Sequence, residues 1–306
     1  MMQDFINAIA LLPERYKEAL MNISPEKCRE IKEIRFRTGE AVTVNTRDHI
    51  YYISHSGRLS VSYSDNAIST DSKDLQEIVF TLSRRSMHTY QDMIVKGFIP
   101  LYGGSKAGIA GRAVMRDGGI YSVTSFNSVN IRVSRAFKGC ADDLLSKMGD
   151  CTSYLIIGSP MSGKTTLLRE LCRQYAGREV LSPRKIAIID ERDEIASRSF
   201  GHSIDVGAHT DVLTLYPKAI GTEIAVRTLS PEIIVLDEIG TEEESRALLS
   251  GMNSGVDFIA TAHGHSFEEV LRRPNIKSLI NAGAFKKIAV LEGKSAPCMV
   301  KELISL

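Results

Sequence analysis

Residues 158–166 of this 306-residue chain read Gly158-Ser-Pro-Met-Ser-Gly163-Lys164-Thr165-Thr166. The stretch fits the pattern Gly-x4-Gly-Lys-Ser/Thr of a loop that binds nucleotide phosphates. The apolar residues 154–157 before it predict a buried strand, and apolar residues at helical spacing after it predict a helix. In this order, the loop and the helix N-terminus direct backbone N–H groups toward a phosphate chain. The sequence therefore predicts an ATP-binding P-loop.

Two residues of the loop have distinct predicted roles. Lys164 is expected to reach the β- and γ-phosphates, and the Thr165 hydroxyl to be a ligand of Mg²⁺. The alternative is a chance glycine loop without a ligand, which the strand and helix on either side disfavour. The predicted nucleotide-binding residues are Gly158, Ser159, Pro160, Met161, Ser162, Gly163, Lys164, Thr165 and Thr166.

A second strand ends in two acids, Ile233-Ile-Val-Leu236-Asp237-Glu238. Asp237 fits the acid that holds Mg²⁺ directly or through water. Glu238 follows by one residue and faces the other way, so we expect it to polarise a water molecule against the γ-phosphate. The pair indicates ATP hydrolysis in addition to ATP binding.

Two further candidate residues also follow predicted strands. Glu191, in the acidic run after residues 186–189, is expected to position water or a metal-bound water. A solvated strand end is the alternative. His263, after residues 258–262, is expected to sense the γ-phosphate, with Thr261 as second choice; a structural histidine is the alternative. His263 and His265 lack an evident third ligand for a metal.

The composition is that of a globular protein, with 43% hydrophobic and 25% charged residues. A net charge of +1 gives no support for wholesale binding to nucleic acid or anionic membranes. The five scattered cysteines form no C-x-x-C pair, which disfavours a zinc module or disulfide framework and favours a reducing cytosol. No apolar run approaches transmembrane length, so we expect a cytoplasmic protein that meets a membrane only through a partner.

The order of predicted elements indicates two domains. Residues 1–135 read as helices followed by a run of strands, which is typical of an α+β domain. Residues 136–152 are expected to form a linker with a short helix, and residues 153–306 an α/β P-loop ATPase domain. The segment 205–231 is expected to be a loop followed by a helix of unassigned role.

Two arginines of the first domain, Arg112 and Arg132, are candidates for contact with phosphates bound elsewhere, because guanidinium groups suit phosphate recognition. Ordinary exposed arginines are the alternative.

The order of motifs resembles the ATPases of type II and type IV secretion systems. It comprises the P-loop, Asp190-Glu191-Arg192, Leu236-Asp237-Glu238-Ile-Gly and Thr261-Ala-His263-Gly. Nearly the full length resembles the stage III sporulation protein AA family within that superfamily. The likeness is carried by the following stretches: Glu33-Ile-Arg35-Phe-Arg37-Thr-Gly39, Gly108-Ile-Ala-Gly-Arg112-Ala-Val, Asn130-Ile-Arg132-Val-Ser-Arg135, and Thr210-Asp211-Val-Leu with Pro217-Lys218-Ala.

The resemblance implies a RecA-like P-loop fold of the additional-strand, catalytic-glutamate type, preceded by a smaller α+β domain. It implies a homo-oligomer, expected to be a hexamer, at the cytoplasmic face of a channel between mother cell and forespore. A membrane protein like stage III sporulation protein AB is the implied partner, and Arg112 or Arg132 would act on a neighbouring subunit's nucleotide.

Two departures from the secretion ATPases limit that comparison. Those ATPases often have glycine where Asp237 stands, and many carry a four-cysteine zinc module that this sequence lacks. The expected activity is hydrolysis of ATP to ADP and phosphate, which energises or assembles a transport channel. The alternatives are a nucleic-acid-associated P-loop ATPase, although nucleic acid is not an expected partner, and a nucleotide-dependent scaffold with little turnover.

Overall fold

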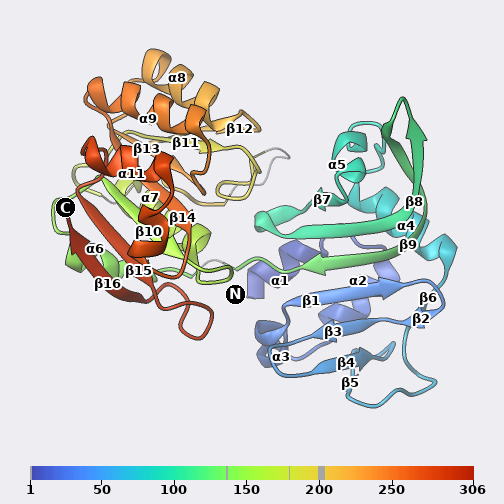
Figure 1. The fold of residues 1–306 in the computed structure, drawn as a ribbon. Helices are drawn as coiled ribbons and strands as arrows, with labels where there is room; N and C mark the ends of the chain where they lie inside the picture. The colour runs from blue at the N-terminus through green and yellow to red at the C-terminus, as the bar shows by residue number, and fades with distance from the viewer. Residues whose placement is uncertain (1, 136, 179, 199–203) are drawn as a thin grey trace. The chain divides into compact units, whose positions relative to one another are not determined.

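The computed structural model describes residues 2–135, 137–178, 180–198 and 204–306. The chain divides into two compact units, residues 1–136 and 137–306 (Figure 1). In the described ranges, no helix combines the length and the apolar character that crossing a bilayer requires.

The first unit begins with helices, and the helices that follow later in its sequence pack against its sheet. Pro13 precedes the second helix, as expected for a residue with a fixed φ. Asp71 caps the fourth helix by accepting hydrogen bonds from the N–H groups of Lys73 and Asp74. The helices are α1 (Met2–Ile9), α2 (Glu14–Met21), α3 (Pro25–Glu30), α4 (Ser72–Leu82) and α5 (Gln91–Val95).

An antiparallel sheet forms the other layer of this unit. Its order is β5 (Leu59–Ser60), β4 (Ile50–Ile53), β3 (Thr43–Asn45), β1 (Glu33–Arg37), β9 (Gly119–Arg132), β8 (Lys106–Arg116) and β7 (Phe98–Pro100). The strands β2 (Glu40–Ala41) and β6 (Ser69–Thr70) form a separate short antiparallel pair. The strands β1 and β3 pair antiparallel, with Ile34 opposite Val44. The long strand β9 pairs with β8 along its whole length.

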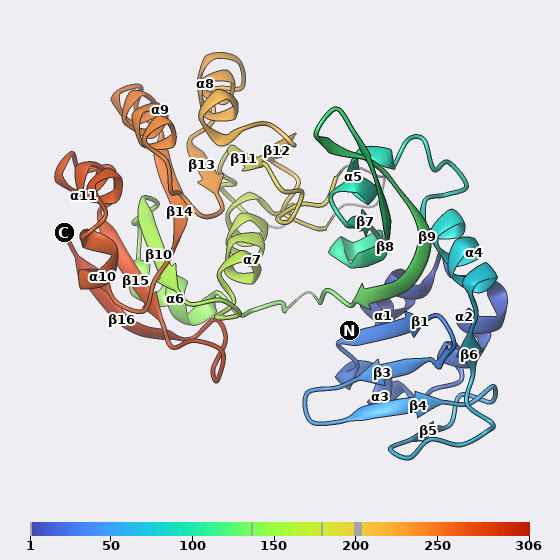
Figure 2. The same ribbon diagram turned by 45° about the vertical axis from the view of Figure 1, so that its right-hand side comes forward.

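The second unit is built on a mostly parallel sheet. Its order is β12 (Thr210–Thr214), β11 (Ile186–Asp190), β13 (Ile233–Leu236), β14 (Asp257–His263), β10 (Tyr154–Gly158), β15 (Lys287–Leu291) and β16 (Val300–Ser305), with β16 antiparallel. The strand β14 lies between the P-loop strand β10 and the acidic strand β13 (Figure 2). This additional strand confirms the predicted fold class.

Helices cover both faces of this sheet, because the central strands are apolar on both sides. Alternate residues of β10 enter different cores: Tyr154 and Ile156 pack in one cluster, Leu155 and Ile157 in the other. The helices α6 (Asp142–Met148) and α7 (Lys164–Ala176) contribute to the first cluster. The second cluster receives α8 (Lys218–Thr228), α9 (Glu242–Asn253), α10 (Phe267–Leu271) and α11 (Pro274–Asn281).

Of two segments with specific expectations in this unit, one agrees with the structure and one differs. The short helix expected within residues 136–152 is α6, whose Leu144 and Met148 are buried in the first core cluster. Residues 210–214, expected within a loop, form the edge strand β12. The alternation of apolar and polar residues that indicates a strand is weak in β12, because exposed Asp211 is followed by two apolar residues, Val212 and Leu213. As an edge strand, β12 pairs with one neighbour, β11.

Candidate nucleotide-binding site

The predicted P-loop joins the end of β10 to the start of α7, and two of its glycines are sterically required. A Cβ on Gly163 would lie 2.6 Å from the Cys298 Sγ, and this glycine has φ of +94°. A Cβ on Gly158 would lie 2.3 Å from the Ser162 Oγ. Both distances are far below van der Waals contact, so the tight loop depends on glycine at these positions.

The loop offers donors to an anion at the start of α7. The first N–H groups of a helix have no partner within the helix, and no side chain in the described part of the chain caps α7. The Lys164 Nζ lies across the loop, 2.7 Å from the Gly158 carbonyl oxygen and 3.0 Å from that of Ser159. Burial lowers the pKa of Lys164, against the opposing effect of Asp237 and Glu238. A phosphate chain at this place would therefore meet both backbone N–H groups and an ammonium group.

Asp237 connects the P-loop to the neighbouring strand. The Thr165 hydroxyl donates to the Asp237 Oδ2 at 2.9 Å, and the Thr261 hydroxyl donates to its Oδ1 at 2.7 Å. The hydroxyl and the carboxylate are hard oxygen donors, the ligands that Mg²⁺ prefers. The two residues predicted to hold Mg²⁺, Thr165 and Asp237, thus lie together with suitable chemistry.

Glu238 has an unusual backbone conformation beside this contact. Its φ is +41°, which is uncommon for a residue with a side chain. The Glu238 N–H donates to the Thr261 Oγ1 at 2.8 Å, and its side chain is 47% exposed. The Arg192 Nη1 lies 3.7 Å from the Glu238 Oε2. The carboxylate is therefore accessible to water, while the backbone that carries it is fixed.

Two other predicted residues lie at the same edge of the sheet. Glu191 follows β11 and lines a small hollow together with Asp237 and Glu238. His263 ends β14, where it pairs in register with Gly158 at the start of the P-loop. The parallel order of the strands brings these residues together, since parallel strands end at one edge.

Two polar residues at this edge have structural contacts. Asp190 is 1% exposed, and its carboxylate accepts hydrogen bonds from the N–H groups of Glu194, Ile195 and Ala196. Thr261 is fully buried between Asp237 and Glu238.

Comparisons with known proteins show which family the chain belongs to. The family model described as Sporulation stage III, protein AA matches residues 3–305. The chain belongs to this family. The stage III sporulation protein AA of Bacillus subtilis (strain 168) is 35% identical over 303 residues, which are 97% of this chain and 94% of that protein. The Arabidopsis thaliana protein SEEDLING PLASTID DEVELOPMENT 1 is 34% identical over 151 residues, 49% of this chain and 22% of its own.

Solved structures show the same fold. The ATPase DotB of Legionella pneumophila matches with a TM-score of 0.55 and 16% identity, over 86% of this chain and 73% of that one. The pilus retraction motor PilT, solved with bound ADP, matches with a TM-score of 0.55 and 11% identity, over 85% and 74%. These matches confirm the predicted resemblance to secretion ATPases at the level of the fold.

A cavity of about 490 Å³ opens beside the P-loop of this family member. Its walls combine the loop and the start of α7 with segments far away in sequence. The latter supply Phe137, Cys140, Pro297 and Cys298. The larger part of the lining is apolar, which suits a flat aromatic ring better than a phosphate.

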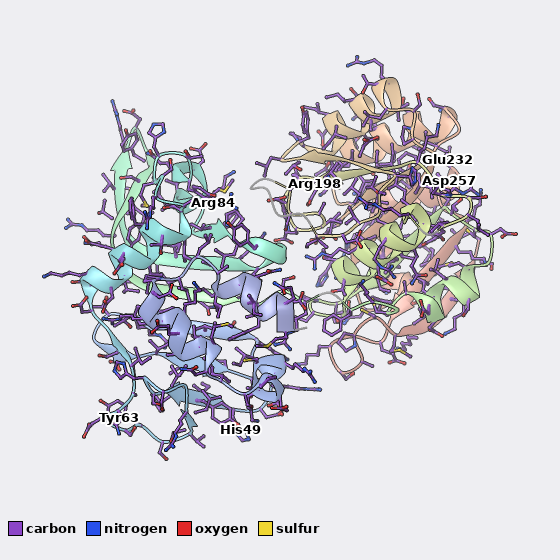
Figure 3. The ribbon with its side chains drawn as sticks, turned by 180° about the vertical axis from the view of Figure 1, so that it is seen from behind. His49, Tyr63, Arg84, Arg198, Glu232 and Asp257 are labelled. Carbon is purple, nitrogen blue, oxygen red and sulfur yellow. The ribbon has the colours of Figure 1, made fainter. Side chains whose placement is uncertain are left out.

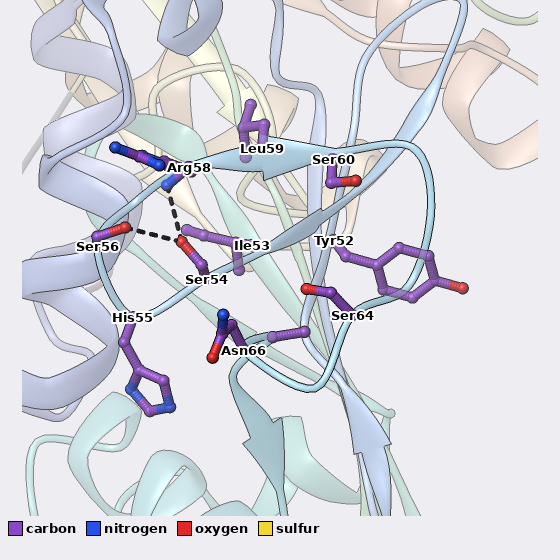
Figure 4. A pocket seen from close by; sticks show the side chains of 11 residues that line it. Tyr52, Ile53, Ser54, His55, Ser56, Arg58, Leu59, Ser60, Ser64 and Asn66 are labelled. Atoms are coloured by element: carbon purple, nitrogen blue, oxygen red, sulfur yellow. Dashed lines mark hydrogen bonds between the residues drawn. The ribbon is translucent and has the colours of Figure 1, made fainter.

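A second hollow, of about 450 Å³, lies in the first unit along residues 52–67 (Figure 4). The Ser54 Oγ there accepts a hydrogen bond from the Arg58 N–H at 3.1 Å and lies 3.0 Å from the Ser56 Oγ. These contacts close a local turn. The hollow contains none of the predicted site residues.

Charged residues also mark the opposite edge of the second sheet. Glu232 directly precedes β13, and Asp257 is the first residue of β14; both are labelled in Figure 3. The Asp257 N–H donates to the Glu232 carbonyl oxygen at 3.0 Å. Glu232 pairs with Arg184 at 2.8 Å. These acids lie at the amino ends of the strands, away from the P-loop edge, and have structural partners.

The predicted arginines both belong to the first unit and are exposed. Arg112 lies opposite Thr124, whereas Arg132 lies opposite Lys106. Positions 124 and 132 of β9 are roughly 26 Å apart at about 3.3 Å per residue. One phosphate group therefore cannot contact both arginines at once.

Sequence reasoning missed Lys218 at this site. Lys218 is the first residue of α8, is 8% exposed, and lies within the hollow formed by Glu191, Asp237 and Glu238. Lys218 belongs to the family-like stretch Pro217-Lys218-Ala, but the stretch assigns it no role, because the contacts of Lys218 are remote in sequence.

Proposed function

We propose that this protein binds ATP with Mg²⁺ at the P-loop and hydrolyses it to ADP and phosphate. The observation that carries the proposal is the 2.9 Å hydrogen bond between Thr165 of the P-loop and Asp237, directly before the exposed carboxylate of Glu238. It joins the loop that would bind phosphates to the acids that would act on water. A loop that only bound nucleotide would need no such pair.

The residues divide the reaction as follows. Loop N–H groups and Lys164 bind the β- and γ-phosphates and stabilise the negative charge of the transition state. Glu238 orients water in line with the γ-phosphorus and takes its proton, while the bond from that phosphorus to the β,γ-bridging oxygen breaks. Mg²⁺, held by Thr165 and Asp237, would neutralise charge on the β- and γ-phosphates. Glu191 and His263 would position water and contact the γ-phosphate.

The cavity beside the P-loop would receive the nucleobase. Its walls from Phe137 and Pro297 offer apolar surface to a ring, and it adjoins Thr166 at the start of α7. A nucleotide with its phosphates on the loop would place its base on this side.

The first experiment compares Glu238→Gln with Glu243→Gln, a change at an exposed acid of α9. We expect Glu238→Gln to retain binding of a fluorescent ATP analogue, because the loop is intact, and to lose about 10²- to 10⁴-fold in turnover. Glu243→Gln should match the unsubstituted protein. Normal hydrolysis by Glu238→Gln would exclude Glu238 as the base.

The cellular setting is proposed from family membership and the shared fold. The protein would act as a homo-hexamer at the cytoplasmic face of a channel between mother cell and forespore, and would energise or assemble that channel. It would meet the membrane through a protein like stage III sporulation protein AB. ATPase activity stimulated by that partner would support this setting, whereas stimulation by single-stranded DNA would favour the nucleic-acid alternative.

Mixing two inactive variants tests whether an arginine acts across subunits. A site shared between subunits takes Glu238 from one chain and Arg112 or Arg132 from the next. Mixed rings of Arg132→Ala and Glu238→Gln would then contain some complete sites, and activity should reappear on mixing. The same mixture made with Arg112→Ala decides between the two arginines. If neither mixture regains activity, the proposed trans role is wrong.

A further inference from the structure

Lys218 occupies a position where a lysine is unfavourable for the local structure. It is the first residue of α8, directly after the N-cap Pro217, so its positive charge opposes the helix dipole. Its side chain is also buried, with 9% of its surface exposed. A buried ammonium group requires partners to offset the lost hydration. A residue that breaks two local rules at a candidate active site points to a role in that site.

Three acceptors surround the Lys218 ammonium group. The Nζ donates to the main-chain carbonyl oxygen of Glu238 at 2.9 Å and to the Glu244 Oε1 at 3.1 Å. The Glu191 Oε2 lies 3.4 Å away. Lysine has three donors, so these three acceptors can satisfy the group completely. Lys218 thereby connects α8 with the residues after β11 and β13.

The position of Lys218 is fixed by packing on its own helix. Gly221, one turn further along α8, approaches β11 so closely that a Cβ there would lie 2.5 Å from the Ile189 Cγ2. The N-terminus of α8 is therefore held against the strand that Glu191 follows.

Both backbone polar groups of Glu238, the N–H and the carbonyl oxygen, are hydrogen-bonded. Its N–H donates to the Thr261 hydroxyl at 2.8 Å, and its carbonyl oxygen accepts from Lys218 at 2.9 Å. Between these two contacts the residue keeps φ at +41°, a conformation that persists only when its surroundings enforce it. The direction of the Glu238 carboxylate depends on that conformation.

We propose that Lys218 is a positioning residue for hydrolysis, which fixes the backbone of Glu238 from one side and orients Glu191 through an ion pair. The inference rests on the proposed ATPase activity. Lys218 does not touch the nucleotide; it acts by keeping the carboxylate of Glu238 directed at the attacking water. Loss of this bond lets the strained backbone relax and moves the carboxylate away from the water.

The test replaces Lys218 with methionine, which keeps the unbranched stem and removes the ammonium group. We expect kcat to fall about 10- to 100-fold, the usual result of a displacement near 1 Å. The KM for ATP and the affinity for a non-hydrolysable analogue should stay within about threefold, because the P-loop is unchanged. Lys277→Met, at an exposed lysine of α11, is the matched control.

A double variant separates positioning from mere charge neutralisation. Glu244 is buried, so Lys218→Met leaves its carboxylate without the lysine and lowers stability. Lys218→Met combined with Glu244→Gln removes that charge too, and glutamine can still accept from the N–H groups of Gly240 and Thr241. The double variant should regain Tm and keep the low kcat. It also serves as the test if the single variant does not fold.

Three outcomes are decisive. An unsubstituted protein without ATPase activity would refute the proposed function and this inference with it. An active protein whose Lys218→Met variant keeps kcat within twofold would overturn the inference alone. Recovery of kcat together with Tm in the double variant would also overturn it, because Lys218 would then only neutralise Glu244.

Discussion

Thr261 offers a sharp test of the contacts that join the P-loop to the acidic strand. Its hydroxyl donates to Asp237 at 2.7 Å and accepts from the Glu238 N–H at 2.8 Å, and the residue is fully buried. Thr261→Val replaces the hydroxyl with a methyl group of similar size. The change keeps the packing of β14 and removes both hydrogen bonds.

The magnitude follows from the two lost contacts. A buried N–H without a partner costs about 1–3 kcal/mol, and a hydrogen bond to a charged group contributes about 1.5–3 kcal/mol. Because Glu238 and Asp237 can relax in part toward water, we expect a total near the sum of the two lower values, roughly 2.5 kcal/mol. For a unit of this size each kcal/mol lowers Tm by about 2–4 °C, so Tm should fall by roughly 5–10 °C.

Thr261→Ser is the matched control, because it keeps the hydroxyl and loses one buried methyl group, worth about 0.8 kcal/mol. Calorimetry of the two variants gives the difference between a lost hydroxyl and a lost methyl group. Steady-state ATP hydrolysis should fall in Thr261→Val and persist in Thr261→Ser. A valine variant as stable and as active as the serine variant would show that these hydrogen bonds neither stabilise the site nor place its acids.

Two further outcomes follow from the structure. Gly163→Ala forces a Cβ against Cys298 at a φ of +94°, so the free energy of unfolding should fall by about 2–4 kcal/mol and nucleotide binding should be lost. Gly255→Ala, also at positive φ but with open space around it, should lose less stability and bind nucleotide normally in a filter-binding assay. Burial raises the pKa of Glu244, but two backbone N–H groups and the nearby ammonium group outweigh it and hold that pKa below its usual value. The folded state therefore gains stability above the unfolded pKa, near 4.3, and loses it as pH falls through the lower folded pKa. Tm should drop less between pH 7 and pH 3 in Glu244→Gln than in Glu243→Gln; equal drops would contradict the reasoning.

Much of the site was predictable because its signals are local. The P-loop is a contiguous motif, and Asp237 and Glu238 directly follow an apolar strand. Parallel strands end at one edge of a sheet, so the sequence alone predicts Glu191 and His263 near them. The roles of these residues in catalysis remain predictions, as does the trans contact of Arg112 or Arg132.

Other features depend on contacts between distant segments. Lys218 lies twenty-six positions from Glu244 in the chain, and its place next to Glu238 follows from the packing of α8 on β11. The edge strand β12 was missed for a similar reason. It is short, and tertiary neighbours supply most of its stability.

By itself, the sequence determined the P-loop, the acidic strand end and the order of strands and helices that makes an α/β sheet, because hydrophobic period and turn residues act over a few positions. Only the tertiary structure decided how the site is held together. Thr261 bonds to Asp237 and to the Glu238 N–H, and Lys218 holds the Glu238 carbonyl. Hydrogen bonds act over about 3 Å, and packing decides which distant residues come that close.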